Sequence, residues 1–571
     1  MDLKDQIIEI ENELDEQVKA LSIWQMPFQS IVSMLLLTID NIDMKGQKET
    51  SMDYTSRLSY IMPLVTSFAA KAPIETTTLA LLKGVEVAYI EEIKFLNAYA
   101  HFCILMPQVR KGIMEVESIN GTEIKFRYPS DEVKYSETID RLYSYLALQM
   151  NVQFPQHKLD FHTAWKVELS PNDINENDML FIKQVFDHYN QNFILIKPLP
   201  EKIFTEMTGL SYNEYHSLSS VVHAFSDFFI SLSRAFYIRS KQVYNPKTAD
   251  ELMAKYFQWI VCCFTHKMLG WFAGMSTLSI EKLDNFLSFY MQIYSNTTGI
   301  EFKENAYCGE GFYPPFLLFD KNVIFSPHAC RYMLTLNNIL YSVNKKQKKK
   351  FDQIISKYLE PTLISQIVYL FSFLPDMIVA KNVNYEYGEI DLIVLSETEN
   401  TTICFQIKST LSPDSARTVE RVTDRVLEGM KQIEAFNGLT AEHKQNIINT
   451  AFEKKLENTA IINLLVVRSC AGSVESWKQN SQNKILNYPL LASIIADKVK
   501  KGNLTLNNFD REVENAQTDL LEKGQSKEVI DKLIIGKYNI EFPNIYSEFR
   551  NIISTNAVTY TVLKDFEEAH C

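Results

Sequence analysis

The chain has 571 residues, of which 46% are hydrophobic and 22% are charged, a balance typical of an ordinary folded protein. Its length exceeds what one hydrophobic core usually spans, so we expect roughly two to four domains. The formal net charge of −13 excludes a protein that coats nucleic acid or an anionic membrane nonspecifically, although it leaves room for a local basic site.

The cysteines and the apolar stretches indicate the compartment. The eight cysteines are scattered without the spacing of a disulfide framework, as in reduced, cytosolic proteins. The acidic, amphipathic start of the chain does not resemble a signal peptide. FQSIVSMLLLTI is too short to span a membrane, and QWIVCCFTHKMLGWFAGM is interrupted by His266 and Lys267. We therefore expect buried helices in both places, and a soluble cytoplasmic protein that does not bind membranes.

The sequence of residues 1–300 predicts a large helical region, which we expect to serve as a sensor or scaffold. Apolar residues such as Leu3, Ile7, Ile10 and Leu14 recur at helical spacing. A β-hairpin interrupts the helices near 114–128, where alternating apolar residues flank Asn120-Gly121, the signal of a type I′ turn. No residues in this region have a catalytic spacing.

The chain changes character after residue 300. Residues 301–340 predict a β-hairpin connector around Asp320-Lys321-Asn322. Residues 341–475 read as helix, three strands, helices and a strand, which is a small αβββαβ unit, and residues 476–571 read as a mostly helical tail. The predicted fold class is thus multidomain and mostly α, with one α/β domain near the C-terminal end.

Polar residues gather on one predicted hairpin of this α/β unit, YGEIDLIVLSETENTTICFQIK. If SETEN forms the turn, with Ser396 opposite Thr401, Asp391 lies opposite Gln406 and Glu389 lies opposite Lys408. The period of two then places these four side chains on one face. The other face is expected to be apolar, with Ile390, Leu392, Val394, Ile403, Phe405 and Ile407.

This group of side chains has a chemical use. A hard divalent cation takes oxygen ligands, which the Asp391 carboxylate, the Gln406 amide and the Ile407 carbonyl could supply. Lys408 could hold a water or stabilise charge on a phosphate, with Glu389 as a further acid. For an acid from the preceding helix, Asp352 is the first choice and Glu360 the second. The alternative is a solvated sheet edge held by cross-strand salt bridges, above all between Glu389 and Lys408.

The segments GEIDLIV and CFQIKS resemble the two motif strands of the PD-(D/E)xK nuclease superfamily, which has the restriction-endonuclease-like fold. The interval from Asp391 to Gln406 is usual for that group, and Gln in place of Glu is similar to the Mrr-like restriction enzymes. The resemblance covers about 135 residues. It implies Asp391 and Gln406 as metal ligands, Lys408 as the catalytic lysine and Asp352 as the helical acid.

The activity implied by the resemblance is hydrolysis of nucleic-acid phosphodiester bonds with Mg²⁺ or Mn²⁺. DNA is the expected substrate, in the manner of a bacterial restriction or antiphage effector, and cutting both strands would favour a homodimer. A protein partner could also act through the helical N-terminal region. Two alternatives stay open: a degenerate nuclease fold that binds nucleic acid or a partner without cleavage, because Gln406 removes one charge, and a helical scaffold whose α/β unit is only structural.

Basic residues near the motif could contact a nucleic-acid backbone. Lys348, Lys349 and Lys350 precede the first helix of the unit, and Arg417, Arg421 and Arg425 recur every four residues on the helix after the motif. Each group has a structural alternative. The lysines could be a solvated linker, and the arginines could pair at i, i+3 with Glu420, Asp424 and Glu428.

Overall fold

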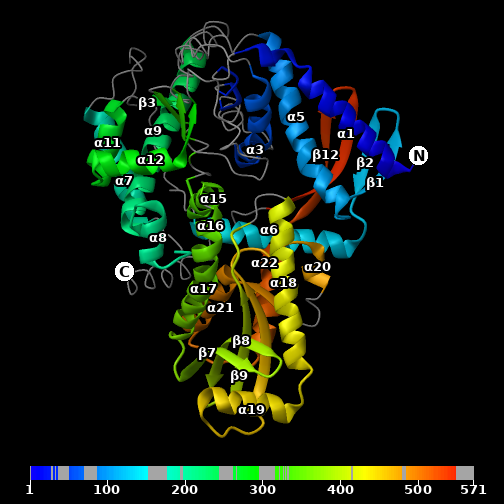
Figure 1. Ribbon diagram of the computed structural model, residues 1–571, viewed down its shortest axis with the longest axis vertical. Helices are drawn as coiled ribbons and strands as arrows, with labels where there is room; N and C mark the ends of the chain where they lie inside the picture. Colours follow the sequence, from blue (N-terminus) through cyan, green and yellow to red (C-terminus); the bar gives the residue numbers. More distant parts are fainter. Residues whose placement is uncertain are drawn as a thin grey trace.

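The computed structural model describes most of the chain, and the structural statements below concern the described residues. These are 2–26, 30–32, 34–36, 51–69, 87–151, 176–192, 197–243, 262–264, 266–294, 316–319, 322–325, 327, 330, 334–346, 348–412, 416–478 and 484–547. Helices predominate, and the strands form three sheets. In Figure 1 one sheet lies in the lower part of the molecule, and two groups of helices lie above it on the left and right.

The group on the right of Figure 1 contains the N-terminal helices and a hairpin. Its elements are α1 (Leu3–Lys19), η1 (Ser22–Gln25), α3 (Ser51–Phe68), α5 (Val87–Arg110), β1 (Glu115–Asn120) and β2 (Glu123–Arg127). The predicted helical stripe on α1 is confirmed, since Ile7, Ile10 and Leu14 are buried. The predicted hairpin is also confirmed, but its turn is not type I′. The loop is Gly121-Thr122 and only Gly121 has a positive φ, of 63°, whereas a type I′ turn needs two.

The group on the left combines helices with a small sheet. The helices are α7 (Glu176–Asn192), α8 (Glu201–Thr208), α9 (Tyr212–Val243), α11 (His266–Ser276), α12 (Ile280–Tyr290) and α15 (Leu336–Lys346). The sheet has the order β3-β6-β5-β4, with β3 (Cys262–Phe264), β6 (Asn322–Phe325), β5 (Phe316–Phe319) and β4 (Met291–Tyr294). The predicted hairpin connector is β5–β6. The helix expected across Cys262 is wrong, because periodicity cannot separate a short apolar strand from a buried helix.

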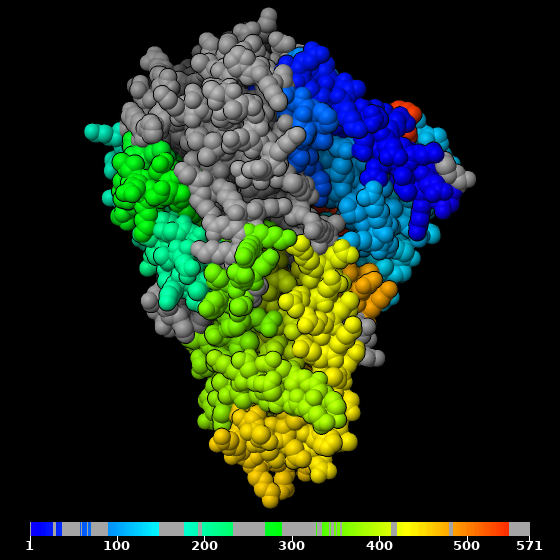
Figure 2. Space-filling view, viewed as in Figure 1, coloured from blue at the N-terminus to red at the C-terminus, as the bar shows by residue number. Residues whose placement is uncertain are grey.

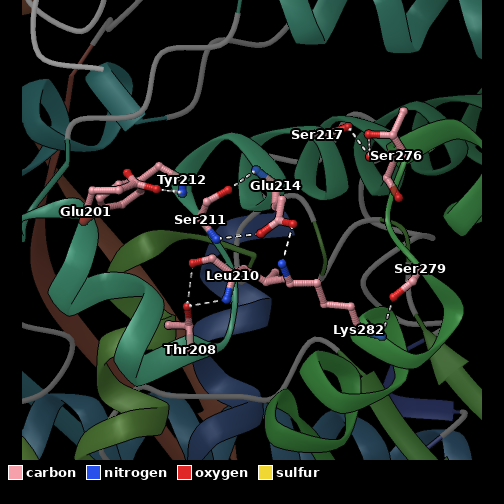
Figure 3. Close-up of polar contacts among 11 residues, drawn as sticks. Glu201, Thr208, Leu210, Ser211, Tyr212, Glu214, Ser217, Ser276, Ser279 and Lys282 are labelled. Carbon is pink, nitrogen blue, oxygen red and sulfur yellow. Dashed lines mark hydrogen bonds and ion pairs between the residues drawn. The ribbon is translucent and has the colours of Figure 1, made fainter.

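The start of α9 shows how the sequence ends one helix and begins the next. Ser211 and Glu214 form a capping box: the Ser211 amide donates to Glu214 Oε2 at 2.8 Å, and the Glu214 amide donates to Ser211 Oγ at 3.1 Å (Figure 3). Lys282 from α12 donates to the same carboxylate at 2.5 Å, and Glu201 accepts from the Tyr212 amide. These bonds fasten α8, α9 and α12 together.

The lower part of the molecule is built on a five-stranded mixed sheet of order β11-β10-β9-β8-β7. Strands β7 (Met377–Tyr385), β8 (Gly388–Ser396) and β9 (Thr401–Lys408) are antiparallel, whereas β9, β10 (Ala460–Val467) and β11 (Lys484–Asn487) are parallel. The chain enters through α16 (Lys348–Lys350), η3 (Phe351–Ile355) and α17 (Ser356–Phe371), and it passes from β9 to β10 through α18 (Ala416–Asn437) and α19 (Ala441–Phe452). This order confirms the predicted αβββαβ arrangement.

Helices cover both faces of this sheet. On one face the ring of Phe371 in α17 lies 5.6 Å from Phe405 in β9 and 6.1 Å from Phe509. On the other face Ile393 and Cys404 pack with Phe436 of α18. Figure 2 shows α18, in yellow, on the surface of the lower part of the molecule.

The C-terminal residues differ most from the prediction. The expected helices are present as α20 (Val474–Lys478), α21 (Tyr488–Lys501) and α22 (Phe509–Gly524), but β11 extends the five-stranded sheet. Strands β12 (Lys527–Ile535) and β13 (Tyr538–Tyr546) join the N-terminal hairpin in a sheet of order β1-β2-β13-β12. The α/β unit therefore extends past residue 475, and α6 (Asp131–Asn151) from the N-terminal half packs into it.

Within the part of the chain that the structure describes, no helix is both long enough and apolar enough to cross a membrane.

Candidate functional site

The polar motif lies where β8 and β9 separate. Their ladder follows the predicted register, with Ser396 opposite Thr401 and Leu392 opposite Phe405, and it stops at that last pair. On the other side of β8 the ladder with β7 skips the pair of Asp391 and Asn382, and Asn382 has a φ of 51°. The sheet is therefore irregular on both sides of Asp391, which frees its side chain to reach between the strands.

Asp391 is buried, and charged side chains of both signs lie near it. It is 6% exposed, and Oδ2 accepts a hydrogen bond from the Ile407 amide at 2.6 Å. Burial raises the pKa of Asp391 to about 6; the Ile407 amide and Lys408 lower it, while Glu360 and Glu389 raise it further. Burial is the largest cause of the raised pKa, and the effects of the neighbouring charges partly cancel one another.

Gln406 reaches across the same opening. Its Nε2 donates to the Glu389 carbonyl at 2.5 Å, which fixes the orientation of the amide, because a carbonyl accepts only from the nitrogen. The other end, Oε1, is buried and has no hydrogen-bond partner among the described residues. A buried acceptor without a donor is costly. Gln406 therefore presents an oxygen that is suited to a cation or a donor from a ligand.

The stem of Lys408 packs against helix α18 at Gly429, where the absence of a side chain leaves room for it. Lys408 is 7% exposed, and a Cβ placed on Gly429 would lie 3.1 Å from Lys408 Cε and 2.6 Å from Leu465 Cδ1. Only glycine leaves this room, so Gly429 positions the lysine stem. The ammonium lowers the pKa of Asp391 and of Glu360, and among the described residues it is in no ion pair or hydrogen bond.

The helical acid of this group is Glu360, the second choice from the sequence. Burial raises the pKa of Glu360, Lys408 and Arg425 lower it, and Glu428 and Glu389 raise it. Glu360 therefore faces the same charges as Asp391. Asp352 lies eight residues earlier in η3 and is exposed. The sequence could not choose between them, because both lie on the predicted helix.

The predicted backbone-contacting residues lie around this end of the sheet. Lys348 and Lys349 are exposed at the start of the helical entry, and Arg421 and Arg425 are exposed on α18. The side chains of Lys350 and Arg417 lie outside the described residues. Arg425 pairs with Glu428 at 2.7 Å, as the i, i+3 alternative predicts, whereas Glu420 faces Lys111 of the N-terminal region at 3.5 Å.

One predicted face is wrong. Ile390 was expected beside Leu392 in the core under α17, yet it packs with Ile393, Cys404 and Phe436 on the α18 side. Leu392 follows the prediction and joins the core with Phe405. The irregularity at Asp391 reverses the alternation at this point, and strict period-two counting cannot foresee such a break.

The oxygen atoms near Asp391 are of the kind that bind a hard divalent cation, but they do not all come from acidic side chains. In the residues that the structure describes, no three His, Cys, Asp or Glu side chains lie close enough to hold a metal ion by themselves. Such an ion would therefore need the Gln406 Oε1 or the Ile407 carbonyl beside Asp391. The buried Gln406 oxygen without a donor is the observation that favours this use.

Comparisons with known proteins add no family assignment, since no family model, curated protein or solved structure matches the chain.

The sequence did not predict two residues at this end of the sheet, Gly429 and Arg468. A glycine inside the predicted helix was the available signal for the first. An arginine directly after an apolar strand was the signal for the second.

Proposed function

We propose that the protein is a metal-dependent nuclease that hydrolyses phosphodiester bonds of nucleic acid, with DNA as the expected substrate. The observation that carries the proposal is the burial of Asp391, Gln406 and Lys408 at one end of the sheet, where the Gln406 oxygen and the Lys408 ammonium have no hydrogen-bond or ion-pair partner in the part of the chain that the structure describes. A purely structural site would satisfy these groups with one another. The αβββαβ order supports the restriction-endonuclease-like fold for this unit.

Each residue has a role in this proposal. Mg²⁺ or Mn²⁺ would be held by the Asp391 carboxylate and Gln406 Oε1, with the Ile407 carbonyl and Glu360 as further oxygen donors. When bound, such an ion would polarise the phosphodiester and lower the pKa of a bound water. Lys408 holds the attacking water or stabilises the charge that develops on the phosphate. The Ile407 amide keeps Asp391 oriented.

Helix α15 shares a core with α7, α8, α9, α11 and α12 of the helical region, and it is connected to the chain that leaves this site. In α15 the Asn337 side chain accepts from the Ser412 amide at 3.0 Å and donates to the Ser412 carbonyl at 3.3 Å, and the Tyr341 hydroxyl donates to the same carbonyl. Ser412 is four residues after Lys408. This attachment supports a sensor role for the helical region, because a movement of α15 would reach the site through four residues.

The test is cleavage of supercoiled plasmid, linear duplex DNA, single-stranded DNA and RNA with Mg²⁺ or Mn²⁺. We expect cleavage of at least one substrate, its loss in EDTA, and its loss in Lys408→Ala. Lys431→Ala, on the exposed side of α18, is the matched control that removes the same charge elsewhere. If neither metal supports cleavage of any substrate, the nuclease proposal fails.

The second candidate is a nuclease fold that binds without cutting. The neutral Gln406 and the absence of three converging acids among the described residues favour it. Gln406→Glu separates the two candidates, because it restores the missing charge. A nuclease is expected to keep or gain metal affinity and activity in this variant, whereas a binding protein gains no cleavage. Nucleic-acid binding by the wild type in EDTA, with no cleavage in either metal, would favour the second candidate.

A further inference from the structure

Arg468, at the same end of the sheet, is a cation that has no counter-ion among the residues that the structure describes. It directly follows β10, and its Nε donates to Ser409 Oγ at 2.9 Å, where Ser409 directly follows Lys408. Its Nη2 is buried and has no hydrogen-bond partner among the described residues. No described carboxylate forms an ion pair with it. Burial lowers the pKa of Arg468 to about 10, so the guanidinium still carries its charge at neutral pH.

The position of Arg468 is one where ligands bind in α/β proteins. Strands β9, β10 and β11 are parallel, with Lys408 beside Val467 and Val467 beside Asn487, so their carboxyl ends meet at one edge. Ligands of open sheets bind outside these ends. Lys408 and Arg468 are offset by one residue in the register, so they extend on opposite faces of the edge.

No described carboxylate is among the groups that act electrostatically on Arg468. Helix α21 begins beside it at Tyr488, with Asn487 as the N-cap, so the positive end of its dipole faces this edge. Tyr212 and Tyr488 act electrostatically on Arg468 and raise its pKa, which favours the charged guanidinium, and Lys197 lies 5.5 Å from the ring of Tyr212. The carboxylates of Glu201 and Glu214, next to Tyr212, are bound to the start of α9 and to Lys282 (Figure 3).

Arg468 is half-buried as a residue, but burying one nitrogen of a cation without an acceptor lowers stability, because that nitrogen loses hydration without gaining a partner. A guanidinium that serves the fold alone would have an acceptor for each buried nitrogen. The Nη2 of Arg468 instead has donor capacity left over, next to a hydroxyl and the positive end of a helix. These are the groups that hold an oxyanion, and arginine suits phosphate above others because its planar nitrogens bind two oxygens at once.

We propose that Arg468 and Ser409 bind a phosphate group at the carboxyl ends of β9 and β10, on the face of the sheet opposite Lys408. The phosphate belongs either to the nucleic-acid strand, in which case the inference rests on the proposed function, or to a free nucleotide, in which case it stands alone. The first source would anchor the strand beside the cleavage site. The second would make the site a place where a small molecule acts on the enzyme.

The first measurement is the thermal unfolding of the full chain in EDTA with inorganic phosphate, against chloride at equal ionic strength. We expect phosphate to raise the Tm of the wild type and of Lys408→Ala, but not that of Arg468→Gln. Without phosphate, Arg468→Gln is expected to be at least as stable as the wild type, because a buried charge is removed. Arg127→Gln on β2, a surface arginine paired with Glu115, is the matched control and should keep the shift.

The second measurement identifies the source of the phosphate by the binding of a labelled oligonucleotide in EDTA, with ATP as competitor. If the strand uses the site, Arg468→Gln weakens binding about tenfold and reduces the salt slope by about 0.9. If a nucleotide uses it, ATP raises the Tm only when Arg468 is present, and oligonucleotide binding is unchanged.

A destabilised Arg468→Gln, or phosphate and ATP shifts that persist in this variant together with unchanged oligonucleotide binding, would overturn the phosphate site. Neither measurement involves cleavage, so failure here leaves the nuclease proposal intact. Failure of cleavage likewise leaves this site testable.

Discussion

Asp140 and Asp391 both have pKa values that are raised by the burial of their carboxyl groups, and yet the two sites differ in kind. Asp140 on α6 accepts from the Ala471 amide at 2.7 Å, the Gly472 amide at 3.2 Å and the Trp477 indole at 3.2 Å. Asp391 accepts from one amide, beside the buried Gln406 oxygen that has no donor. Burial raises the pKa of Asp140 to about 7 and that of Asp391 to about 6.

The comparison teaches that a raised pKa does not by itself identify a catalytic acid. The Asp140 carboxylate accepts from two amides and an indole of residues 471–477, and these hydrogen bonds fasten α6 to the α/β unit. At Asp391 the surroundings include the buried Gln406 Oε1, which accepts no hydrogen bond from a described residue. Buried polar atoms that lack hydrogen-bond partners distinguish a site that binds a ligand from a contact that only stabilises the fold.

The largest expected effect is on activity. Asp391→Ala is expected to lower metal-dependent cleavage by about a thousandfold or more, since it removes a ligand on which the proposed chemistry depends. Asp140→Asn should retain cleavage, because Asp140 only joins two elements. Initial rates on the best substrate of the panel check this. Equal losses in the two variants would mean that the comparison has no functional content.

Stability should show the reverse order. Asp140→Ala leaves three buried donors without an acceptor, and we expect a loss of about 3 kcal/mol in the free energy of unfolding. Asp391→Ala exposes one such donor and also removes a carboxylate that lies among other acids, so its loss should be smaller. Denaturant unfolding at pH 7 measures both, with coincident transitions by two probes as the control for two-state behaviour.

The pH dependence of stability follows from the direction of the shift at Asp391. Its pKa is raised from 3.8 to about 6 in the folded protein, so the folded state binds the proton more tightly than the unfolded state. The stability that this group contributes is present below about pH 4 and is lost as the pH rises to about 6.

Asp391→Asn cannot titrate. Relative to the wild type it should therefore gain on the order of 2 kcal/mol between pH 4 and pH 7. Unfolding at a series of pH values tests this gain, and a difference that does not vary with pH would contradict the burial of the charge.

Gly429→Ala sharpens the comparison by moving one side chain of the site. The new Cβ would meet Leu465 and the stem of Lys408, so we expect a loss of about 1–2 kcal/mol and a lower kcat from the displaced ammonium. Gly438→Ala is the matched control, because a Cβ there has only ordinary contacts at 3.5 Å and beyond. If both variants keep full activity, Gly429 does not position Lys408.

The smallest effect is expected at Arg425. Its ion pair with Glu428 is exposed, so Arg425→Ala should change stability by at most about 0.5 kcal/mol. If Arg425 contacts a nucleic-acid backbone, the same variant weakens binding of every sequence alike and reduces the salt slope. Binding titrations at several salt concentrations measure both. Unchanged binding would leave Arg425 as a helix-stabilising residue only.

The sequence by itself determined the local features of this protein. The turn at SETEN and the alternation of β8 and β9 set the register, so the pairing of Ser396 with Thr401 was predictable. The apolar stripe of α1 and the order αβββαβ follow equally from period and length, which depend on neighbouring residues only. The gathering of Asp391, Gln406 and Lys408 at one end of the sheet was predictable from that register.

The tertiary structure alone decided what lies far apart in sequence. It placed Glu360 among the charges that act on Asp391, brought Gly429 against Lys408, and placed Arg468 beside Ser409 with no counter-ion among the described residues. It also added α6 and β11 to the α/β unit and returned β12 and β13 to the N-terminal hairpin. The physical reason is that burial, desolvation and long-range pairing depend on contacts between distant segments, which no local pattern encodes.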